Sequence, residues 1–351
     1  MKLFASCTAV IALASSAFGQ IVIDGTLDAD YGSPKASQNN HTGFGNATDG
    51  VKSFANGSEL NAGWVKVDEA GGYLYIFLSG NMESNFNKLE VLVDCVAGEG
   101  QNTLLNSNPD VDYNGLNKLA GTKFDADFAP DFYLTTTLGD TNGLITQYAN
   151  IAQLLTAGNG VGAYIGNGVF ADANTPNLLD DATYGCQLSI DNSNVGGVSG
   201  DSANPGSGCG VTTGIEIKIP LVLTGWSSGD IKVMAFVNGG GHDYASNQVL
   251  GSLPLGSGNL GGDGLGNFDG TVHVDFSLIE GNQYFSTADA DVCAACFGDL
   301  DGSGDVGSGD VALLLLDYGP CPNCQADLDG SGNVDFGDVA LVLLSTGPCG
   351  G

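Results

Sequence analysis

Acidic side chains recur at fixed spacing in two segments near the end of this 351-residue chain. A 28-residue unit occurs twice, at 296–323 and 324–351, and 18 of its positions are identical. Each unit places oxygen-bearing side chains at positions 1, 3, 5 and 12 of a loop with glycine at position 6, which is the ligand order of an EF-hand calcium loop. The pattern predicts two calcium sites, the first formed by Asp299, Asp301, Ser303, Asp305 and Asp310 and the second by Asp327, Asp329, Ser331, Asn333, Asp335 and Asp338.

An apolar stretch with helical character follows each loop, at 311–318 and 339–345, and none precedes either loop. Position 12 is aspartate in both, where an EF-hand usually has a bidentate glutamate. Duplicated loop–helix units of this kind resemble the type I dockerin modules of cellulosomal enzymes, and the resemblance covers about the last 56 residues. It implies calcium-dependent folding and docking onto a cohesin module, usually to deliver a polysaccharide-degrading enzyme to a scaffold.

In dockerins the choice of partner depends largely on the residues at loop positions 10 and 11. These are Ser308 with Gly309 and Phe336 with Gly337, in place of the family's usual pair of small hydroxyl residues. The basic residues that the family carries farther along the helices are also missing, since no lysine follows Lys232. Two alternatives therefore stay open for the tail. It docks onto a cohesin-like or other cell-surface partner, or it is a calcium-stabilised terminus without one.

A further acidic segment lies in the middle of the chain. Asp110, Asp112 and Asn114 repeat the first half of a calcium loop, but Gly121 stands where the last ligand is needed. Carboxylates that follow closely offer replacements. The sequence therefore predicts a third structural calcium, and the alternative is that these residues are solvated loop acids. The predicted ligands are Asp110, Asp112, Asn114, Asp125, Asp127 and Asp131.

Two glycine motifs match catalytic or nucleotide-binding signatures without their context. Residues 225–229 spell GxSxG, but the next segment, 231–237, has a strand pattern where a nucleophile elbow needs a helix, so we expect a hairpin turn. Gly256, Gly258 and Gly261 match GxGxxG with no βαβ pattern around them. The sequence therefore contains no recognisable catalytic constellation.

Three ring side chains are candidates for ligand binding. Trp64 and Trp226 are the only tryptophans, and each either packs in the core or stacks on a sugar ring. His242 follows a strong strand within a glycine-rich segment, which either lines a binding site or forms a surface turn.

Charge narrows the classes of partner. Asp and Glu number 40 against nine basic residues, all of them lysine, and the net charge is −31. Such a chain repels nucleic acid and anionic membranes, and without arginine it lacks the planar fork that grips phosphate. We expect no nucleic-acid partner, and divalent cations are the natural counterions.

The first residues indicate export. Lys2 precedes an apolar run at 3–14 and small residues up to Gly19, which predicts a signal peptide at 1–19 and a secreted or cell-surface protein. No other apolar stretch is long enough for membrane insertion.

Export makes disulfides the expected state of the cysteines beyond the leader. Two pairs have equal separation, each bracketing one calcium loop, and a third pair closes a glycine-rich loop. The expected bridges are Cys296–Cys321, Cys324–Cys349 and Cys186–Cys209, with Cys95 and Cys293 as a less defined pair. Because 293–296 and 321–324 have CxxC spacing, zinc is the alternative.

The remaining pattern predicts the fold. Glycine reaches 56 residues without a collagen-like period, and short β-rich runs alternate with turn clusters up to about residue 290. We expect a mainly β fold, with a large β-sandwich domain at 20–290 and a small α-helical dockerin-like domain at 293–351. Among the expected strands, 215–219 and 272–278 alternate apolar and polar residues, and the others are 73–78, 89–93, 132–137 and 231–237.

The opening Ile23-Asp24-Gly25 and the aromatic run at 72–76 are similar to the start of family 9 carbohydrate-binding modules and related DOMON-like β-sandwiches, although Tyr31 stands near their usual tryptophan. This resemblance covers about 60 residues and implies sugar binding. We therefore expect a non-catalytic, polysaccharide-binding domain with a docking or anchoring tail. The alternatives are a secreted polysaccharide-degrading enzyme that carries a dockerin, and a cell-surface structural or adhesion protein.

Overall fold

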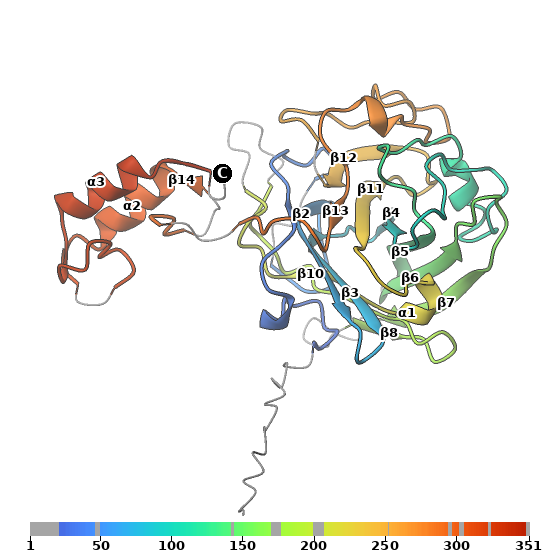
Figure 1. The fold of residues 1–351 in the computed structure, drawn as a ribbon, viewed down its shortest axis with the longest axis horizontal. Coiled ribbons are helices and arrows are strands. Elements are labelled where there is room, and N and C mark those ends of the chain that lie inside the picture. The colour runs from blue at the N-terminus through green and yellow to red at the C-terminus, as the bar shows by residue number, and fades with distance from the viewer. Residues whose placement is uncertain are drawn as a thin grey trace, which may run out of the picture.

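The computed structural model has a large β domain with a small helical module beside it (Figure 1). The structure describes residues 21–45, 50–141, 144–169, 177–198, 207–251, 253–293, 297–301, 305–321 and 324–348. The predicted signal peptide at 1–19, Cys296, Ser303 and Cys349 lie outside these ranges. Within them, every helix is too short or too polar to span a bilayer.

Two antiparallel sheets form the β domain, which confirms the predicted mainly β, sandwich-like fold. The first sheet has the order β1 (Ala36–Ser37), β2 (Glu59–Asp68), β3 (Tyr73–Asn81), β10 (Gly214–Pro220), β9 (Gln187–Ile190) and β8 (Asn177–Asp180). The second has the order β12 (Ala245–Leu250), β11 (Lys232–Asn238), β4 (Asn85–Asp94), β5 (Phe132–Thr141), β6 (Leu144–Gln153) and β7 (Gly162–Val169), and β13 (Phe285–Ser286) pairs with β11. Short helical turns are η1 (Ala29–Tyr31), η2 (Leu116–Leu119), α1 (Leu221–Thr224) and η3 (Phe276–Leu278).

The main core lies between the two sheets and follows the two-residue period of the strands. Leu74 and Ile76 of β3 enter it from the first sheet, and Leu89, Val91 and Val93 of β4 from the second. All five side chains are fully buried. Each sheet therefore commits one face to this core, and what covers the other face decides where ligands have access.

The outer face of the first sheet is partly sealed by the start of the mature chain. The isoleucines of 215–219 are buried as predicted, but Glu216 is buried as well rather than solvated. Its carboxylate accepts hydrogen bonds from the backbone N–H groups of Asp24 (2.9 Å) and Gly25 (3.1 Å) and from the Tyr31 hydroxyl (3.0 Å). Gly25 has φ +82°, and a Cβ there would lie 2.5 Å from the backbone nitrogen of Asp191, so glycine is required.

The outer face of the second sheet carries a separate apolar cluster formed with long loops. Segment 272–278, predicted as a strand, belongs to these loops and ends in η3. Val272, Val274 and Phe276 are buried as the alternation suggested, but the backbone N–H of Val272 bonds Lys118 O and that of Phe276 bonds Lys123 O. Alternation shows only that one side of a segment is buried. The backbone N–H groups of this segment bond to carbonyl groups of loops rather than to a neighbouring strand.

The tail consists of two interlocked units. Helices α2 (Ser308–Leu316) and α3 (Phe336–Leu344) follow the two loops, each starting three residues before the predicted stretch. The strand β14 (Asp305–Val306) of the first unit pairs with β17 (Gly347–Pro348) after α3, and β16 (Asn333–Val334) of the second pairs with β15 (Gly319–Pro320) after α2. A small core of Val306, Leu314, Ala326, Val334 and Val342 lies between the units.

The cysteine pairing differs from the prediction. Cys209 bonds Cys293 rather than Cys186, with a Cα–Cα distance of 5.5 Å, and Cys321 bonds Cys324 with a Cα–Cα distance of 5.6 Å. Cys95 and Cys186 are buried free thiols, so the pairing of Cys95 with Cys293 is also wrong. Spacing along the chain could not reveal this, because the fold carries Cys186 into the core between the sheets, away from the surface where Cys209 lies.

The same result excludes both predicted bridges of the tail. Since Cys321 and Cys324 are joined to each other, neither is available to Cys296 or Cys349. The described part of the chain contains two disulfides, one in the β domain and one in the tail, and disulfides are typical of chains that fold in an oxidising compartment.

Glu59 at the start of β2 is a fully buried carboxyl group without a cationic partner among the described residues. Its Oε1 accepts hydrogen bonds from the side-chain amides of Asn61 (3.0 Å), Asn81 (3.3 Å) and Asn194 (2.5 Å). Burial outweighs these amides and raises the pKa of Glu59 to about 7. The group is therefore protonated in the folded protein at mildly acidic pH.

We expect the β domain to lose stability as pH rises, because the folded pKa of Glu59 lies above the ordinary value of 4.5. The stabilisation is fully present below pH 4.5 and is lost as pH passes through 7, a change of about 3 kcal/mol from this group. Glu59→Gln should flatten that slope in urea unfolding followed by tryptophan fluorescence. Both tryptophans lie in the β domain, so the tail does not contribute.

The exposed Glu69→Gln serves as the control and should keep the wild-type slope. Glu216→Gln should remove a second share, since burial also raises the pKa of Glu216 to about 7. A slope identical in Glu59→Gln and wild type between pH 5 and pH 8 would contradict this account.

Candidate functional site

Each tail loop gathers three carboxylates around one point. The first group is Asp299, Asp301 and Asp310, and in each residue one carboxylate oxygen lies within 4.8 Å of those of the others. Asp299 and Asp310 are buried, although no basic residue exists in the tail to neutralise them. The ligands predicted at loop positions 1, 3 and 12 are thus brought together.

The second loop repeats this arrangement with Asp327, Asp329 and Asp338, again within 4.8 Å of one another. Asp327 Oδ2 accepts a hydrogen bond from the backbone N–H of Gly332 (2.8 Å). Asp327 Oδ1 is buried and has no hydrogen-bond partner in the described part of the chain. A buried carboxylate oxygen without a donor is costly unless a cation satisfies it.

The aspartate at position 12 also holds each loop onto its helix. Asp310 Oδ1 accepts from the backbone N–H groups of Leu300 (2.7 Å) and Asp301 (3.1 Å), and Oδ2 from that of Gly307 (2.7 Å). Burial opposes ionisation of Asp310, but these three donors outweigh it and lower the pKa. The shorter aspartate reaches the backbone of its own loop and stays ionised.

Asp338 makes the same three bonds in the second loop, to Leu328 (2.7 Å), Asp329 (3.1 Å) and Asp335 (2.8 Å). Its pKa is lowered for the same reason, because the backbone donors outweigh the effect of burial. The repeat therefore preserves a local device as well as a ligand pattern.

The donor set fits calcium. Oxygens that bind one Ca²⁺ at about 2.3 to 2.6 Å lie at most about 5.2 Å from each other, and the three carboxylates of each loop meet that limit. Hard oxygen donors with no imidazole or thiolate among them favour Ca²⁺ over zinc. Asp299, Asp301 and Asp310, and likewise Asp327, Asp329 and Asp338, are the residues that would hold the ions.

The other predicted ligands have different standing. Asn333 lies in β16, and its carbonyl oxygen accepts from the Ser331 hydroxyl (3.0 Å). Asp335 is the N-cap of α3 and accepts from the backbone N–H of Gly337 (2.7 Å). Asp305, at position 7 of the first loop, lies in β14. Neither of the two carboxylate groups found among the described residues includes Asp335.

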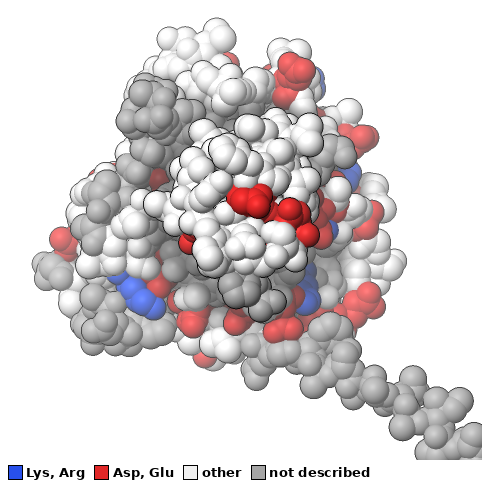
Figure 2. Space-filling model, turned by 90° about the vertical axis from the view of Figure 1, so that its left-hand side faces the viewer, with Lys and Arg blue, Asp and Glu red and all other residues white. Residues whose placement is uncertain are grey.

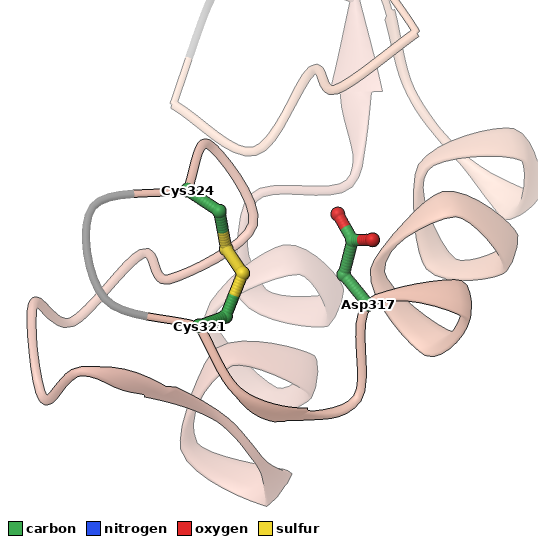
Figure 3. Close-up of side chains that lie close together, drawn as sticks. All are labelled: Asp317, Cys321 and Cys324. Carbon is green, nitrogen blue, oxygen red and sulfur yellow. A yellow bond between two sulfur atoms is a disulfide. The ribbon is translucent and has the colours of Figure 1, made fainter.

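A third group, Asp317 with Cys321 and Cys324, lies between the two units (Figure 3). The two sulfur atoms are bonded to each other, and the Asp317 carboxylate points towards the bridge. Bonded sulfurs are not thiolate ligands, so the oxidised protein does not offer the zinc site that the CxxC spacing suggested.

The surface of the tail has one sign of charge. All nine lysines lie at or before Lys232, and Figure 2, which looks onto the tail, shows acidic side chains gathered at the centre of an otherwise uncharged face. Without a nearby cation the carboxylates of each loop repel one another. A divalent ion bound in each loop would therefore stabilise the folded tail.

The six residues of the predicted third calcium site are not gathered into a carboxylate group in the described part of the chain. Asp112 pairs with Lys88 and His242, and Asn114 accepts from Asn117. The others serve other parts of the domain: Asp125 accepts from Gln283 N, Asp127 O from Lys232 Nζ, Asp131 from Cys95 N and Val96 N, and Asp110 lines a surface hollow.

His242 is buried, with 3% of its surface exposed, rather than in a surface turn. Its Nδ1 lies 2.7 Å from Glu90 Oε1 and its Nε2 lies 2.8 Å from Asp112 Oδ2. Burial alone would lower the pKa of His242, but the two carboxylates outweigh it and raise the pKa to about 9. The ring is therefore an imidazolium at neutral pH that fixes Asp112 in place.

Neither the ring's two partners nor the rest of this network was evident from the sequence. Lys88 Nζ lies 2.7 Å from Asp112 Oδ2, and Tyr133 donates its hydroxyl to Glu90 Oε2 (2.7 Å). One feature of the sequence indicates such a network: positions 88 and 90 are charged residues at alternate positions of an apolar strand. Charged residues in a buried strand require partners.

Both tryptophans pack against apolar clusters of the β domain. Trp64 is 4% exposed, packs edge-on against Phe77 and donates its indole N–H to Gly32 O (3.0 Å). Trp226 is partly buried against the main core and donates to Gly229 O (2.9 Å). The GxSxG motif at 225–229 forms the turn between α1 and β11, not the predicted hairpin turn, because β10 and β11 lie in different sheets.

Comparison with known proteins adds no relative: no family model matches the chain, and neither does any curated protein or solved structure. Function must therefore be argued from geometry.

We expect the full mature chain to take up two calcium ions in isothermal titration calorimetry. Asp301→Asn should remove the first and Asp329→Asn the second, because each takes one of three charges from its group and weakens that site by at least about tenfold. The exposed Asp317→Asn is the matched control and should keep two ions. Two ions bound by Asp329→Asn with unchanged affinity would contradict the assignment.

Proposed function

We propose that this protein is a secreted calcium-binding protein in which a non-catalytic β domain binds polysaccharide and a calcium-stabilised tail docks or anchors it. The observation that carries the proposal is the duplicated group of three carboxylates, one in each loop–helix unit, in a module without a single basic residue. A repeat that conserves both the ligand geometry and the helix that follows it favours binding of two ions as a condition of folding.

An apolar surface on the tail supports docking to a protein partner. Leu316 and Leu344, at the ends of α2 and α3, are 81% and 84% exposed. They belong to a larger set of exposed apolar side chains on the two helices and their ends: Leu313, Leu315, Leu316, Tyr318, Phe336, Leu343 and Leu344. A small module that exposes this much apolar surface is expected to bury part of it against another molecule. A cohesin-like or cell-surface protein is the partner we propose.

A surface hollow in the β domain supports ligand binding there. It measures about 670 Å³ and lies over β4 to β7, within the size range of small-molecule sites. The charged side chains at its base, Lys88 and Asp112, are paired with each other. Side chains neutralised in this way suit recognition of an uncharged ligand better than acid–base catalysis, which favours the binding module over the enzyme.

Calcium should control docking. In surface plasmon resonance against a panel of cohesin modules and against cell-surface extract of the producing cells, binding should be present with calcium and lost with EGTA. Leu316→Ser with Leu344→Ser should reduce it at least about tenfold. Leu265→Ser, at an equally exposed leucine of the β domain, is the control. Equal binding with and without calcium would contradict calcium-dependent docking.

The β domain should retain the mature chain on insoluble polysaccharide without degrading it. Sedimentation with cellulose, xylan, mannan and pectin measures retention, and release of reducing sugar on the same substrates measures turnover. Retention without turnover is the expected result. Turnover on any substrate would favour the secreted polysaccharide-degrading enzyme, and neither retention nor turnover would favour a structural or adhesion protein.

A further inference from the structure

Strand register builds the floor of the hollow over β4 to β7. Lys88 of β4 pairs with Thr137 of β5, and Thr137 pairs with Tyr148 of β6. One step along, Asn150 of β6 pairs with Tyr164 of β7. Alternate residues of a strand point to the same face, so these side chains share the outer face of the second sheet.

The same face becomes apolar further along the strands. Leu92, Tyr133 and Ala152 form a paired row and are buried beneath the long loops that carry the second apolar cluster. The polar rows face the hollow, which the loop residues 110–113 also line. The hollow therefore lies over the polar half of a sheet face whose other half is a packed core.

Aromatic rings surround the opening. Phe86, Tyr113 and Tyr164 line the hollow and are 44%, 99% and 55% exposed. Gly139 makes room for one of them, since a Cβ there would lie 2.0 Å from the Phe86 ring. Exposed rings gathered around one concavity mark a binding surface, because each leaves an apolar face in water.

Backbone strain concentrates at the same place. Seven non-glycine residues of the described chain have positive φ, and five of them line the hollow or adjoin the residues that do: Phe86 (+71°), Asp112 (+46°), Tyr113 (+56°), Asn114 (+66°) and His242 (+55°). Such backbone conformations are strained and collect at functional sites. The His242 imidazole holds this turn through Asp112, which fixes the rim before any ligand arrives.

Two polar groups in the hollow are left for a ligand. The side-chain amide of Asn150 is 93% buried and has no hydrogen-bond partner among the described residues. Asp112 directs Oδ2 to both Lys88 and His242, and within the same described residues Oδ1 has no partner. An amide and a carboxylate oxygen together offer donors and acceptors that suit vicinal hydroxyl groups.

We propose that this hollow is the sugar-binding site of the β domain and that it takes a neutral glycan, with a pyranose ring stacked on Tyr164 and hydroxyl groups bonded to Asn150 and Asp112. The inference rests on the proposed polysaccharide binding and names its site and ligand class. It places recognition on tyrosine and phenylalanine rings of the second sheet rather than on Trp64 or Trp226.

Charge decides between neutral and acidic glycans. Lys88 and Asp112 cancel each other, as do the His242 imidazolium and Glu90, and Asp110 adds one negative charge at the wall. An anionic sugar would have to displace Asp112 from Lys88 and face Asp110 in a chain with a net charge of −31. Uronates and sulfated sugars are therefore excluded.

The test is calorimetric titration of the mature chain in calcium with hexasaccharides of cellulose, xylan, mannan and laminarin, and with hexagalacturonate. At least one neutral oligosaccharide should bind, and hexagalacturonate should not. Tyr164→Ala and Asn150→Ala should each weaken that binding about tenfold. Phe268→Ala, at a 66% exposed ring outside the hollow, should leave it unchanged. Thermal unfolding by tryptophan fluorescence shows that each variant is folded.

Each result decides a different point. Neutral binding that survives both substitutions in the hollow would overturn the site and leave polysaccharide binding standing. Preference for hexagalacturonate would overturn the choice of a neutral ligand. Absence of binding to every oligosaccharide, together with no retention on insoluble polysaccharide, would overturn both the site and the proposed function of the β domain.

Discussion

The organisation of the β domain depends on the second sheet, because both faces of this sheet carry apolar side chains that must be buried. Its inner face packs on the first sheet, while its outer face has apolar residues at one end of β4, β5 and β6 and polar residues at the other. Loops pack on the apolar half, whereas in the polar half Lys88 and Glu90 are buried with oppositely charged partners and Lys88 and Asn150 line the hollow. The hollow, the strained turn at Asp112 and the His242 contact all follow from this division.

A second constraint runs through the whole molecule: 40 carboxyl groups share nine lysines and three histidines. The fold satisfies its buried acids in three ways. Asp112 and Glu90 receive cations, Asp131 receives backbone N–H groups, and Glu59 holds a proton instead. The tail contains no basic residue, so we expect an external divalent ion to neutralise the carboxylates of its two loops.

The tail also shows why its repeat is duplicated. A single loop–helix unit buries very little, and its short strand has no partner of its own. Crossing the units pairs β14 with β17 and β16 with β15, and it closes one small core between the two helices. Each acidic loop is therefore held in place by strand pairing with the other unit. Such mutual support is the general reason that short repeats occur in multiples.

The sequence alone determined the features that are local. Binary alternation predicted the β fold and five of its strands, and ligand spacing predicted both acidic groups of the tail, since a 12-residue loop brings its own side chains together. Even the buried outer residues of 272–278 were evident from alternation, although the strand was not. The pattern could not show which segments of the chain lie beside 272–278.

Contacts between distant segments were decided only by the tertiary structure. Glu90, Asp112 and His242 are far apart in sequence and meet because β4 and β11 are neighbours in the second sheet and the loop bearing Asp112 folds over that sheet. Cys209 meets Cys293 across 84 residues for the same kind of reason, and no spacing rule anticipates it. The physical difference is one of loop closure: local geometry fixes contacts within a dozen residues, whereas longer ones depend on which faces the core leaves open.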